Sequence, residues 1–591
     1  MKILGISGID GTVAFKRRHW PGLEEREYRI SQGHDSAAAL VIDGEFVAGV
    51  AEERVSRRKH TGDFPIGAIH ACLAQAGLRP EELDEIAHGF DYEPYRSFYS
   101  LDPIASELYR DVLSRPAFVS QVRAAFPQLP DRRVRHVDHH LAHAASAYFT
   151  SGWDDCLVIV IDGMGEAHGA TVYRAQAGRL EPLQRISAVD SIGILYSVVT
   201  LQLGFDFNSD EYKVMGLAPY GDADRFRPFF DEILSLRDDG GWTIPLLRDQ
   251  TREERENHTG ARRHLSEHLI AARAVDAEIT TDHEDVAAGL QACLDRAILH
   301  LCGHWGRELG LPRLALAGGV ALNTTANARL IEAGIFDEIY VQPAAADDGT
   351  SLGAALQRAA AAGEVVNRRS PTPFYGPGYG SAEVAAALAT CADRVEITRL
   401  PSLQATCDAA AALIGEGEVI AWYRGRMEFG PRALGHRSIL ADPGRPEMRD
   451  RVNGLVKMRE GFRPFAPAVS LGQVDRFFDV APGTELPYMN VNVNVRPQYR
   501  AELPATTHVD GSSRVETVSE VDNAEFHALL SAIGHSTGRE VVLNTSFNVK
   551  GQPIVNTPAE AIETFLGTGI QALFLEDTLV RKRSSAVAGL D

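Results

Sequence analysis

Apolar runs followed by alternating segments occur twice in the first third of the chain. Residues 2–7 predict a buried strand, and residues 35–50 alternate around an Asp-Gly pair and predict a β-hairpin. The pattern returns at residues 156–163, which are followed by two strand-like segments at 169–174 and 180–183. Two such units, about 155 residues apart, indicate a duplicated α/β fold that binds its ligand between the halves.

A helix and a glycine pair follow this repeat. Residues 284–310 predict a helix, and a buried strand then leads into Gly318 and Gly319 at the start of another helix. Glycines at a strand-to-helix turn let backbone N–H groups face a phosphate, but a glycine pair is equally typical of tight packing. Both interpretations stay open from the residues alone.

The densest cluster of proline and glycine begins at Pro371, after an Ala-rich helix that ends near Gly363. We therefore expect two domains, with a boundary between residues 370 and 371. In the second domain, residues 419–423 and 540–544 predict strands of a mixed α/β fold.

The composition is that of an ordinary globular protein. A chain of 591 residues is longer than a domain with a single hydrophobic core, so two or more domains are expected, and a hydrophobic content of 45 % is enough to give each a core. Apolar runs stay well below the roughly 18 residues of a membrane span, so we expect a soluble cytoplasmic protein with no membrane partner. The six cysteines are scattered without a CxxC pair, which favours free buried thiols.

The charge is uneven along the chain. A net charge of −21 disfavours nucleic-acid partners. Residues 424–463 depart from this, because they hold ten Lys and Arg against five Asp and Glu and so carry a charge of +5. A local site for phosphate groups is therefore compatible with an acidic protein.

Residues 138–148 hold two histidines with the spacing of one helical turn. The Ala-rich run predicts a helix capped by Asp138, on which His139 and His143 share one face. Such a pair can bind Zn, Fe, Mn or Ni, whereas His140 points about 100° away. The alternative is a helix start with solvated histidines, in a chain with 20 of them.

Two aspartates extend this candidate site. Asp162 ends the second buried strand, and Asp347 lies in a turn before a helix. In a duplicated fold both open onto the central cleft, where two imidazoles and two carboxylates make a mixed metal site. Taken singly, each aspartate is equally typical of a turn or an N-cap.

Four longer strings then point to a known family. Residues 138–144 (DHHLAHA), 211–221 (EYKVMGLAPYG), 425–435 (GRMEFGPRALG) and 543–548 (LNTSFN) occur in this order and span nearly the whole chain. They resemble the O-carbamoyltransferases related to nodulation protein U and to the enzymes that carbamoylate cephalosporins and tobramycin. The resemblance implies an actin-like N-terminal domain of the ASKHA class, similar to the tRNA threonylcarbamoyl-transfer enzyme, and a YrdC-like C-terminal domain.

The resemblance also implies roles for residues of the first domain. It makes His139, His143, Asp162 and Asp347 the ligands of a divalent metal, which is iron in the family. It places a further set near the nucleotide or adenylate: Gly318, Gly319, Asn323, Glu211 and Lys213.

His34 matches the family's catalytic histidine, and Lys59 matches a lysine near the adenylate. Imidazole titrates close to working pH and suits a general base, although a turn-capping histidine is the alternative. Some relatives carry an acid two residues earlier, where this chain has Gln32. That difference leaves more of the acid–base work to His34.

The YrdC-like signature is Lys-x-Arg followed later by Ser-x-Asn, and residues 457–459 and 546–548 satisfy it. Carbamoyl phosphate and ATP are polyanions, which charge-assisted donors must hold while charge shifts between phosphates. An isolated arginine is usually a solvated side chain, but here clustering and the family match favour an anion site. Its candidate residues are Arg432, Lys457, Arg459, Arg463, Arg514, Ser546 and Asn548.

By the same resemblance, we expect residues 8–30 to form a longer loop than the corresponding one of the aminoglycoside enzyme. One hypothesis is a lid over the acceptor, in which Phe15 and Trp20 contact apolar ligand surface. The alternative is a mobile surface insertion.

The resemblance implies an ATP-dependent O-carbamoyltransferase. Its C-terminal domain would convert carbamoyl phosphate and Mg-ATP into carbamoyl adenylate, and its N-terminal domain would pass the carbamoyl group to a hydroxyl of a small natural product, as in antibiotic biosynthesis. Two alternatives remain. A tRNA threonylcarbamoyl-adenosine synthase is disfavoured by the −21 charge, and a non-catalytic actin-like nucleotide-binding protein leaves the Lys-x-Arg and Ser-x-Asn elements unexplained. The acceptor, the metal and the oligomeric state, including a homodimer, are not fixed by the sequence.

Overall fold

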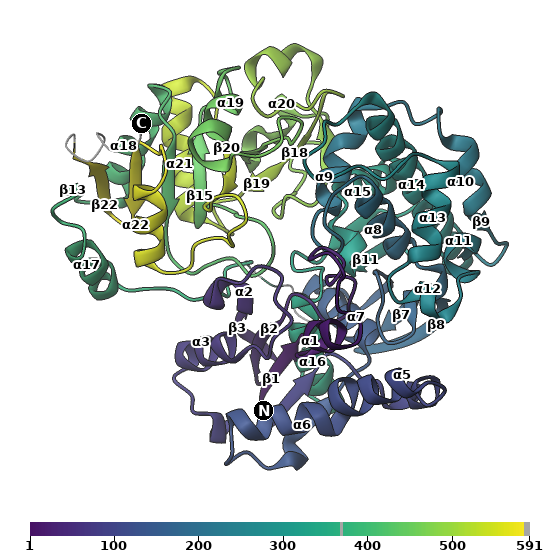
Figure 1. The fold of residues 1–591 in the computed structure, drawn as a ribbon. Coiled ribbons are helices and arrows are strands. Elements are labelled where there is room, and N and C mark those ends of the chain that lie inside the picture. Colours follow the sequence, from purple (N-terminus) through teal and green to yellow (C-terminus); the bar gives the residue numbers. More distant parts are fainter. Residues whose placement is uncertain (367–369, 371, 584–591) are drawn as a thin grey trace. The chain divides into compact units, whose positions relative to one another are not determined.

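The chain forms two compact units in the computed structural model, which describes residues 1–366, 370 and 372–583 (Figure 1). The first unit comprises Met1–Glu53 and His60–Ser370, and the second comprises Arg54–Lys59 and Pro371–Asp591. We call Arg54–Lys59 the strap. The sequence suggested a single boundary and gave no sign of the strap. Pro371, where the breaker cluster begins, lies outside the described residues.

The first sheet of the first unit has five strands in the order β3-β2-β1-β4-β5. β1 pairs antiparallel with β2 and parallel with β4, and the predicted hairpin is confirmed as β2 and β3. Asp43 and Gly44 both have positive φ angles, of 51° and 80°, which a tight hairpin turn needs. The strands are Lys2–Ser7, Ala37–Ile42, Glu45–Ala51, Glu85–His88 and Val134–His136.

The second sheet repeats this plan in the order β8-β7-β6-β11-β12. β6 pairs antiparallel with β7 and parallel with β11, as β1 does with β2 and β4. The repeat expected from the apolar pattern is therefore present in strand order and direction. These strands are Asp155–Ile161 (β6), His168–Gln176 (β7), Arg179–Ser187 (β8), Arg313–Ala317 (β11) and Glu338–Val341 (β12).

Two helices pack against each other and against these sheets. Helix α16 (Asp348–Ala361) packs on β1 and β2, and α7 (His139–Ser151) packs on β6 and β11. At Gly353 the two helices are too close for any side chain, because a Cβ there would lie 1.7 Å from the carbonyl oxygen of Ala142. Glycine at this position fixes the spacing between the two helices.

Further helices complete the first unit. The predicted helix at 284–310 is confirmed as α14 (Thr281–Leu309), which ends at Gly310 in the left-handed conformation. It packs against α8 (Ile192–Gln202), α9 (Glu211–Leu217) and α15 (Thr324–Glu332).

The segment 8–30 is folded onto the first unit. It contains α1 (Thr12–His19), where the Phe15 ring is buried and the Lys16 ammonium donates to the carbonyl oxygens of Ile30 and Glu256, at 2.5 and 3.2 Å. Phe15 is thus held by the packing of its own unit. Whether the segment covers an acceptor stays a prediction.

The second unit is built on an eight-stranded mixed sheet in the order β13-β22-β21-β14-β15-β20-β16-β19. Helices α18 (Leu403–Gly415) and α21 (Ala524–Thr537) contribute to one apolar core, and α17 (Ser381–Ala389) and α22 (Pro558–Leu566) to the other. The two predicted strands are confirmed as β14 and β20. The strands are Val395–Arg399 (β13), Ile420–Tyr423 (β14), Arg437–Ala441 (β15), Ala466–Ser470 (β16), Glu516–Val518 (β19), Val541–Ser546 (β20), Ala572–Leu575 (β21) and Thr578–Lys582 (β22).

Two expectations about the whole chain can be compared with the structure. All six cysteines are buried and free, as expected. Within the described residues, none of the helices combines the length and the apolar character that crossing a bilayer requires.

Candidate functional site

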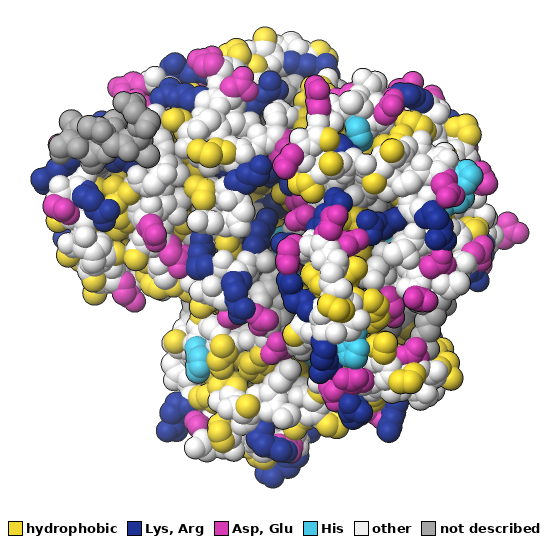
Figure 2. Space-filling view, viewed as in Figure 1, with side chains coloured by type: hydrophobic (Ala, Val, Ile, Leu, Met, Phe, Trp, Pro, Cys, Tyr) yellow, Lys and Arg dark blue, Asp and Glu magenta, His cyan; other side chains and the backbone are white. Residues whose placement is uncertain are grey.

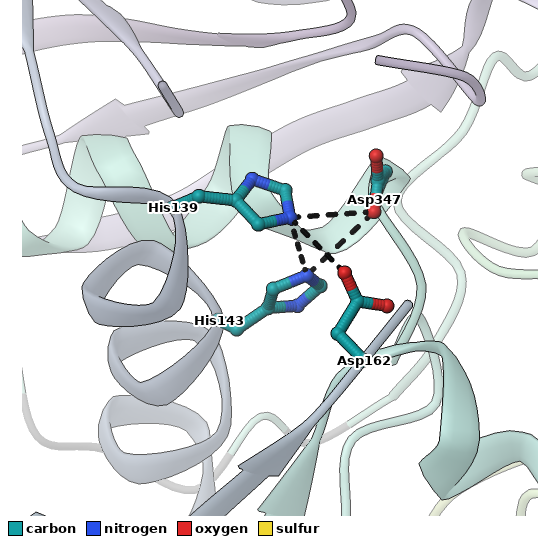
Figure 3. A group of neighbouring side chains, drawn as sticks. All are labelled: His139, His143, Asp162 and Asp347. Carbon is teal, nitrogen blue, oxygen red and sulfur yellow. Dashed lines mark hydrogen bonds and ion pairs between the residues drawn. The ribbon is translucent and has the colours of Figure 1, made fainter. Parts of the chain in front are cut away.

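The four predicted metal ligands converge in the first unit (Figure 3). The Nε2 atoms of His139 and His143 lie 3.1 Å apart, and Asp162 Oδ2 lies 3.5 Å from that of His139. Asp347 Oδ1 is 3.5 and 3.7 Å from the two nitrogens. Metal bonds of about 2.1 Å at right angles separate two ligand atoms by about 3.0 Å, so the arrangement fits a single ion.

A hydrogen bond turns His139 toward this point. His139 Nδ1 lies 3.0 Å from the carbonyl oxygen of Gly89, which can only accept, so Nδ1 carries the proton and Nε2 keeps its lone pair. The cap predicted for α7 is confirmed, because Asp138 accepts from the backbone N–H of Leu141 at 2.9 Å. His140 pairs with Thr171 at 2.8 Å and stays outside the cluster, as predicted.

The charges of the four side chains compensate each other. Burial lowers the pKa of His139, but Asp347 and Asp162 outweigh it and raise that pKa well above its usual range. Burial raises the pKa of Asp162, but His139 and His143 outweigh it and lower that pKa. The buried Asp162 carboxylate and the half-buried Asp347 carboxylate, beside two buried imidazoles, thus make a site with a strong preference for positive charge.

The fold places the two aspartates at element ends. Asp162 follows β6, and Asp347 directly precedes α16. Asp162 Oδ1 accepts from the backbone N–H of Gly319 at 3.0 Å, which fixes its orientation. A Cβ on Gly318 would lie 2.2 Å from the carbonyl oxygen of Ile161, and its φ of 91° also favours glycine. The glycine pair therefore packs tightly and orients the Asp162 carboxylate, and its expected place near a nucleotide stays a prediction.

The other residues expected near a nucleotide are held by their own unit. Asn323 caps α15 and exchanges two side-chain hydrogen bonds with Gln291, at 3.0 and 3.1 Å. Glu211 accepts from Ser197 at 2.6 Å, and burial raises its pKa. Lys213 pairs with Asp210 at 2.8 Å.

His34 lies near the metal centre, close enough for Asp347 to act on its pKa. Its Nε2 is 3.0 Å from the carbonyl oxygen of Arg29, so Nε2 carries the proton and Nδ1 is the basic nitrogen. Burial lowers the pKa of His34 and favours the neutral ring. Gln32 donates to the carbonyl oxygen of Gly165 at 2.9 Å and accepts from the Tyr92 hydroxyl.

Glu166 was missed from the sequence. Its carboxylate accepts from the backbone N–H groups of His139 and Asp91, at 3.0 and 2.7 Å, and so supports the start of α7. Burial raises its pKa to about 8. An acid five residues after the end of β6 carries no pattern that would reveal this role.

The Lys-x-Arg and Ser-x-Asn elements meet in the second unit. The buried Lys457 ammonium lies 3.1 Å from Ser546 Oγ and 2.8 Å from Asn548 Oδ1, and it also donates to the Ser546 carbonyl oxygen. Residues about 90 positions apart therefore form one contact, in which Lys457 meets both polar residues of the Ser-x-Asn element.

Further cations gather around Lys457. Burial, with Arg459, Arg463 and Lys59 nearby, lowers the pKa of Lys457 well below its usual range. Burial, with Arg432, Arg459 and Arg463 nearby, does the same to Arg514. In the described part of the chain, the buried Nε of Arg514 has no hydrogen-bond acceptor. We call Lys59, Arg432, Lys457, Arg459, Arg463 and Arg514 the cation cluster.

A buried glutamate shapes the loop that carries Arg432. Glu428 Oε1 accepts from the backbone N–H groups of Leu434, His436 and Arg437, at 2.8, 3.0 and 3.2 Å. This nest of donors curls residues 428–437 around a single carboxylate, which explains the glutamate in that motif.

Comparison with known proteins shows the family of the chain. The family model described as carbamoyltransferase N-terminus matches residues 28–99 and 101–356, and the one described as carbamoyltransferase C-terminus matches residues 411–582. The protein is therefore an enzyme of the transferase class that moves carbamoyl groups. More narrowly, the chain belongs to the carbamoyltransferase family that also contains the nodulation proteins, and the resemblance seen in the sequence is confirmed.

Individual relatives cover most of the chain. Nodulation protein NolNO of Sinorhizobium fredii is 38 % identical over 573 residues, which are 94 % of this chain and 80 % of that protein. Nodulation protein U of Bradyrhizobium diazoefficiens is 28 % identical over 570 residues, which are 90 % of this chain and 94 % of that protein. Among solved structures, component A of the Acidaminococcus fermentans (R)-2-hydroxyglutaryl-CoA dehydratase is 15 % identical and covers 61 % of this chain and 99 % of its own, with a TM-score of 0.33.

Proposed function

We propose that this enzyme is an ATP-dependent O-carbamoyltransferase with a divided reaction. The second unit makes carbamoyl adenylate: carbamoyl phosphate loses phosphate to water, and the carbamate attacks the α-phosphorus of ATP, which releases pyrophosphate. The first unit then passes the carbamoyl group to a hydroxyl of a small molecule, and AMP leaves. The observation that carries this proposal is a cation cluster in one unit and a metal centre in the other.

The folds of the two units suit this division. The repeated strand order of the two sheets supports an actin-like first unit, a class in which ligands bind between the halves. The contact of Lys457 with Ser546 and Asn548 supports a YrdC-like second unit. Fold alone does not establish chemistry, so the site residues carry the assignment.

The cation cluster is suited to polyanions. Burial and like charge lower the pKa of Lys457 and Arg514, so a phosphate group between them would relieve repulsion and make charge-assisted hydrogen bonds. Donors already fixed by the protein need little reorganisation when charge moves from one phosphate to another. Mg²⁺ would accompany ATP.

His139, His143, Asp162 and Asp347 would hold a divalent ion, and iron is our expectation. When bound, the ion supplies a Lewis acid that polarises a phosphate or hydroxyl oxygen. The protein contributes the charge of two carboxylates and a buried, fixed imidazole pair.

His34 is the candidate base. Its neutral Nδ1 can accept the proton of an acceptor hydroxyl as that oxygen attacks the carbamoyl carbon. Its lowered pKa keeps the ring neutral and therefore competent at neutral pH.

A small acceptor fits the surface better than RNA does. Basic and acidic side chains are interspersed on the face shown in Figure 2, and the net charge is −21. Family membership sets aside the non-catalytic interpretation.

The test is pyrophosphate release by the purified full-length enzyme with Mg-ATP. We expect release with carbamoyl phosphate and none with threonine and bicarbonate. A matched Lys457→Met variant should be inactive in the same assay. Release only with threonine and bicarbonate would contradict the proposal, as would release that does not depend on carbamoyl phosphate.

A further inference from the structure

The strap leaves and re-enters the first unit at two residues that contact each other. The backbone N–H of His60 donates to Glu53 Oε2 at 3.0 Å, and His60 Nδ1 lies 2.7 Å from Asp35 Oδ1. Asp35 directly follows His34 in the chain. The base of the strap is therefore closed by side chains of the first unit, while residues 54–59 belong to the second.

Arg57 anchors the middle of the strap. Its Nη1 donates to the carbonyl oxygen of Ile554 at 2.6 Å, and its Nη2 donates to that of Pro553 at 2.9 Å. Nη1 also lies 3.3 Å from Glu560 Oε2. The planar guanidinium thus grips two successive carbonyls, a geometry that the single ammonium of a lysine cannot reproduce.

Other features show that the strap is held in one conformation. Arg57 has a φ of 63°, in the left-handed region that residues with a Cβ avoid, so its side-chain contacts must stabilise this backbone. Arg54 is buried and donates to the carbonyl oxygen of Gly430 at 3.0 Å, next to the loop that bears Arg432.

Lys59 lies two residues beyond this anchor. It is a member of the cation cluster, because its charge acts on Lys457 together with Arg459 and Arg463. Bringing like charges together is unfavourable unless contacts elsewhere hold them. The strap offers such contacts through Arg57, on the carbonyl oxygens of Pro553 and Ile554, and through Arg54, on that of Gly430.

We propose that Arg57 is a positioning residue, whose grip on Pro553 and Ile554 holds the Lys59 ammonium in the cation cluster so that it binds a phosphate group of the substrates. The inference rests on the proposed role of that cluster. Arg57 touches neither substrate nor the reacting atoms. Its loss should weaken binding of the anion and leave turnover at saturation nearly unchanged.

The experiment measures carbamoyl-phosphate-dependent pyrophosphate release by the full-length enzyme. For Arg57→Ala we expect the KM for carbamoyl phosphate or for ATP to rise about tenfold with kcat within about threefold. Arg57→Lys should recover only part of the loss. The matched control is Arg58→Ala, which removes the same charge from an exposed neighbour and should stay within about twofold.

A double-mutant cycle then separates positioning from general damage. If Arg57 acts through Lys59, Arg57→Ala combined with Lys59→Ala should be no worse than Lys59→Ala alone. Effects that multiply, or an Arg57→Ala variant that behaves like Arg58→Ala, would overturn the inference. Should Arg57→Ala fail to fold, Arg57→Lys takes its place in the cycle.

Failure of the proposed function would look different. In that case the wild-type enzyme itself releases no pyrophosphate with carbamoyl phosphate. Calorimetric binding of inorganic pyrophosphate would then report on the cluster directly. About tenfold weaker binding by Arg57→Ala than by Arg58→Ala would support the positioning role, and equal binding by the two would refute it.

Discussion

The metal centre and the cation cluster are opposite solutions to the same problem of burying charge. In the first unit, two imidazoles and two carboxylates compensate each other, and Asp347 raises the pKa of His139 against its burial. In the second unit, burial and neighbouring cations lower the pKa of Lys457 and Arg514 together. We therefore expect the first arrangement to bind a cation and the second an anion. A difference of this kind predicts that each site can be disabled without affecting the other.

The largest effect is expected at the cation cluster. Lys457→Met should lower kcat/KM for pyrophosphate release about a thousandfold, because it removes a buried donor from the region where phosphate charge shifts. Metal content, measured by elemental analysis, should not change. Lys550→Met is the matched control, since that lysine is 57 % exposed. A large loss of metal in Lys457→Met would mean that the two sites are not independent.

The converse variant acts on the metal centre. His143→Ala should weaken divalent-metal binding about a hundredfold, because it removes one of four ligands. Pyrophosphate release should stay within about threefold of the wild-type rate. His140→Gln, on the same helix but outside the cluster, should retain the metal. Metal titration with a competing chelator measures both, and equal affinity in the two variants would contradict the assigned ligand set.

Protons should move in opposite directions at the two sites. The pKa of Lys457 is depressed in the free enzyme, so an arriving anion raises it and binding takes up protons. Pyrophosphate affinity should therefore fall as pH rises through that lowered pKa, by at most about tenfold per pH unit. Binding of a metal ion by histidine and carboxylate ligands instead releases protons. Calorimetry in buffers of different ionisation enthalpy measures whether protons are taken up or released in each binding reaction. Proton release on pyrophosphate binding would refute the expected uptake.

The smallest effect is expected from the helix spacing. Gly353→Ala places a Cβ 1.7 Å from the carbonyl oxygen of Ala142, so α7 and α16 must separate slightly. We expect about fivefold weaker metal binding and a lower melting temperature, with overpacking costing about 1–3 kcal/mol. Gly472→Ala, where a Cβ meets no atom within 4 Å, is the control. Unchanged metal affinity would mean that the helix spacing does not set the ligand distances.

The convergence of His139, His143, Asp162 and Asp347 could be predicted from the sequence because its signals are local. His139 and His143 have the period of a helix, and Asp162 follows a strand whose apolar run is unmistakable. The repeat of strand and hairpin then placed these elements on one cleft. Glu166 escaped notice because its role depends on backbone N–H groups, which leave no trace in residue order.

The cation cluster was accessible only through the resemblance. Arg514 comes from a short strand far along the chain from Lys457, and no period links the two. The sequence showed no sign of the two hydrogen bonds between Asn323 and Gln291 either, because Gln291 lies in α14 and Asn323 caps α15. The strap is a six-residue excursion inside one unit's sequence, too short to carry its own hydrophobic pattern.

The strap also limits how this enzyme can be taken apart. A fragment that begins after Ser370 would contain the eight-stranded sheet and all arginines of the cation cluster, yet it would lack Lys59 and the anchoring guanidinium of Arg57. Cutting the polypeptide between residues 370 and 371 would thus leave neither unit complete. Dissection in the laboratory, and exchange of modules between relatives, would need to graft those six residues along with the carboxyl-terminal portion.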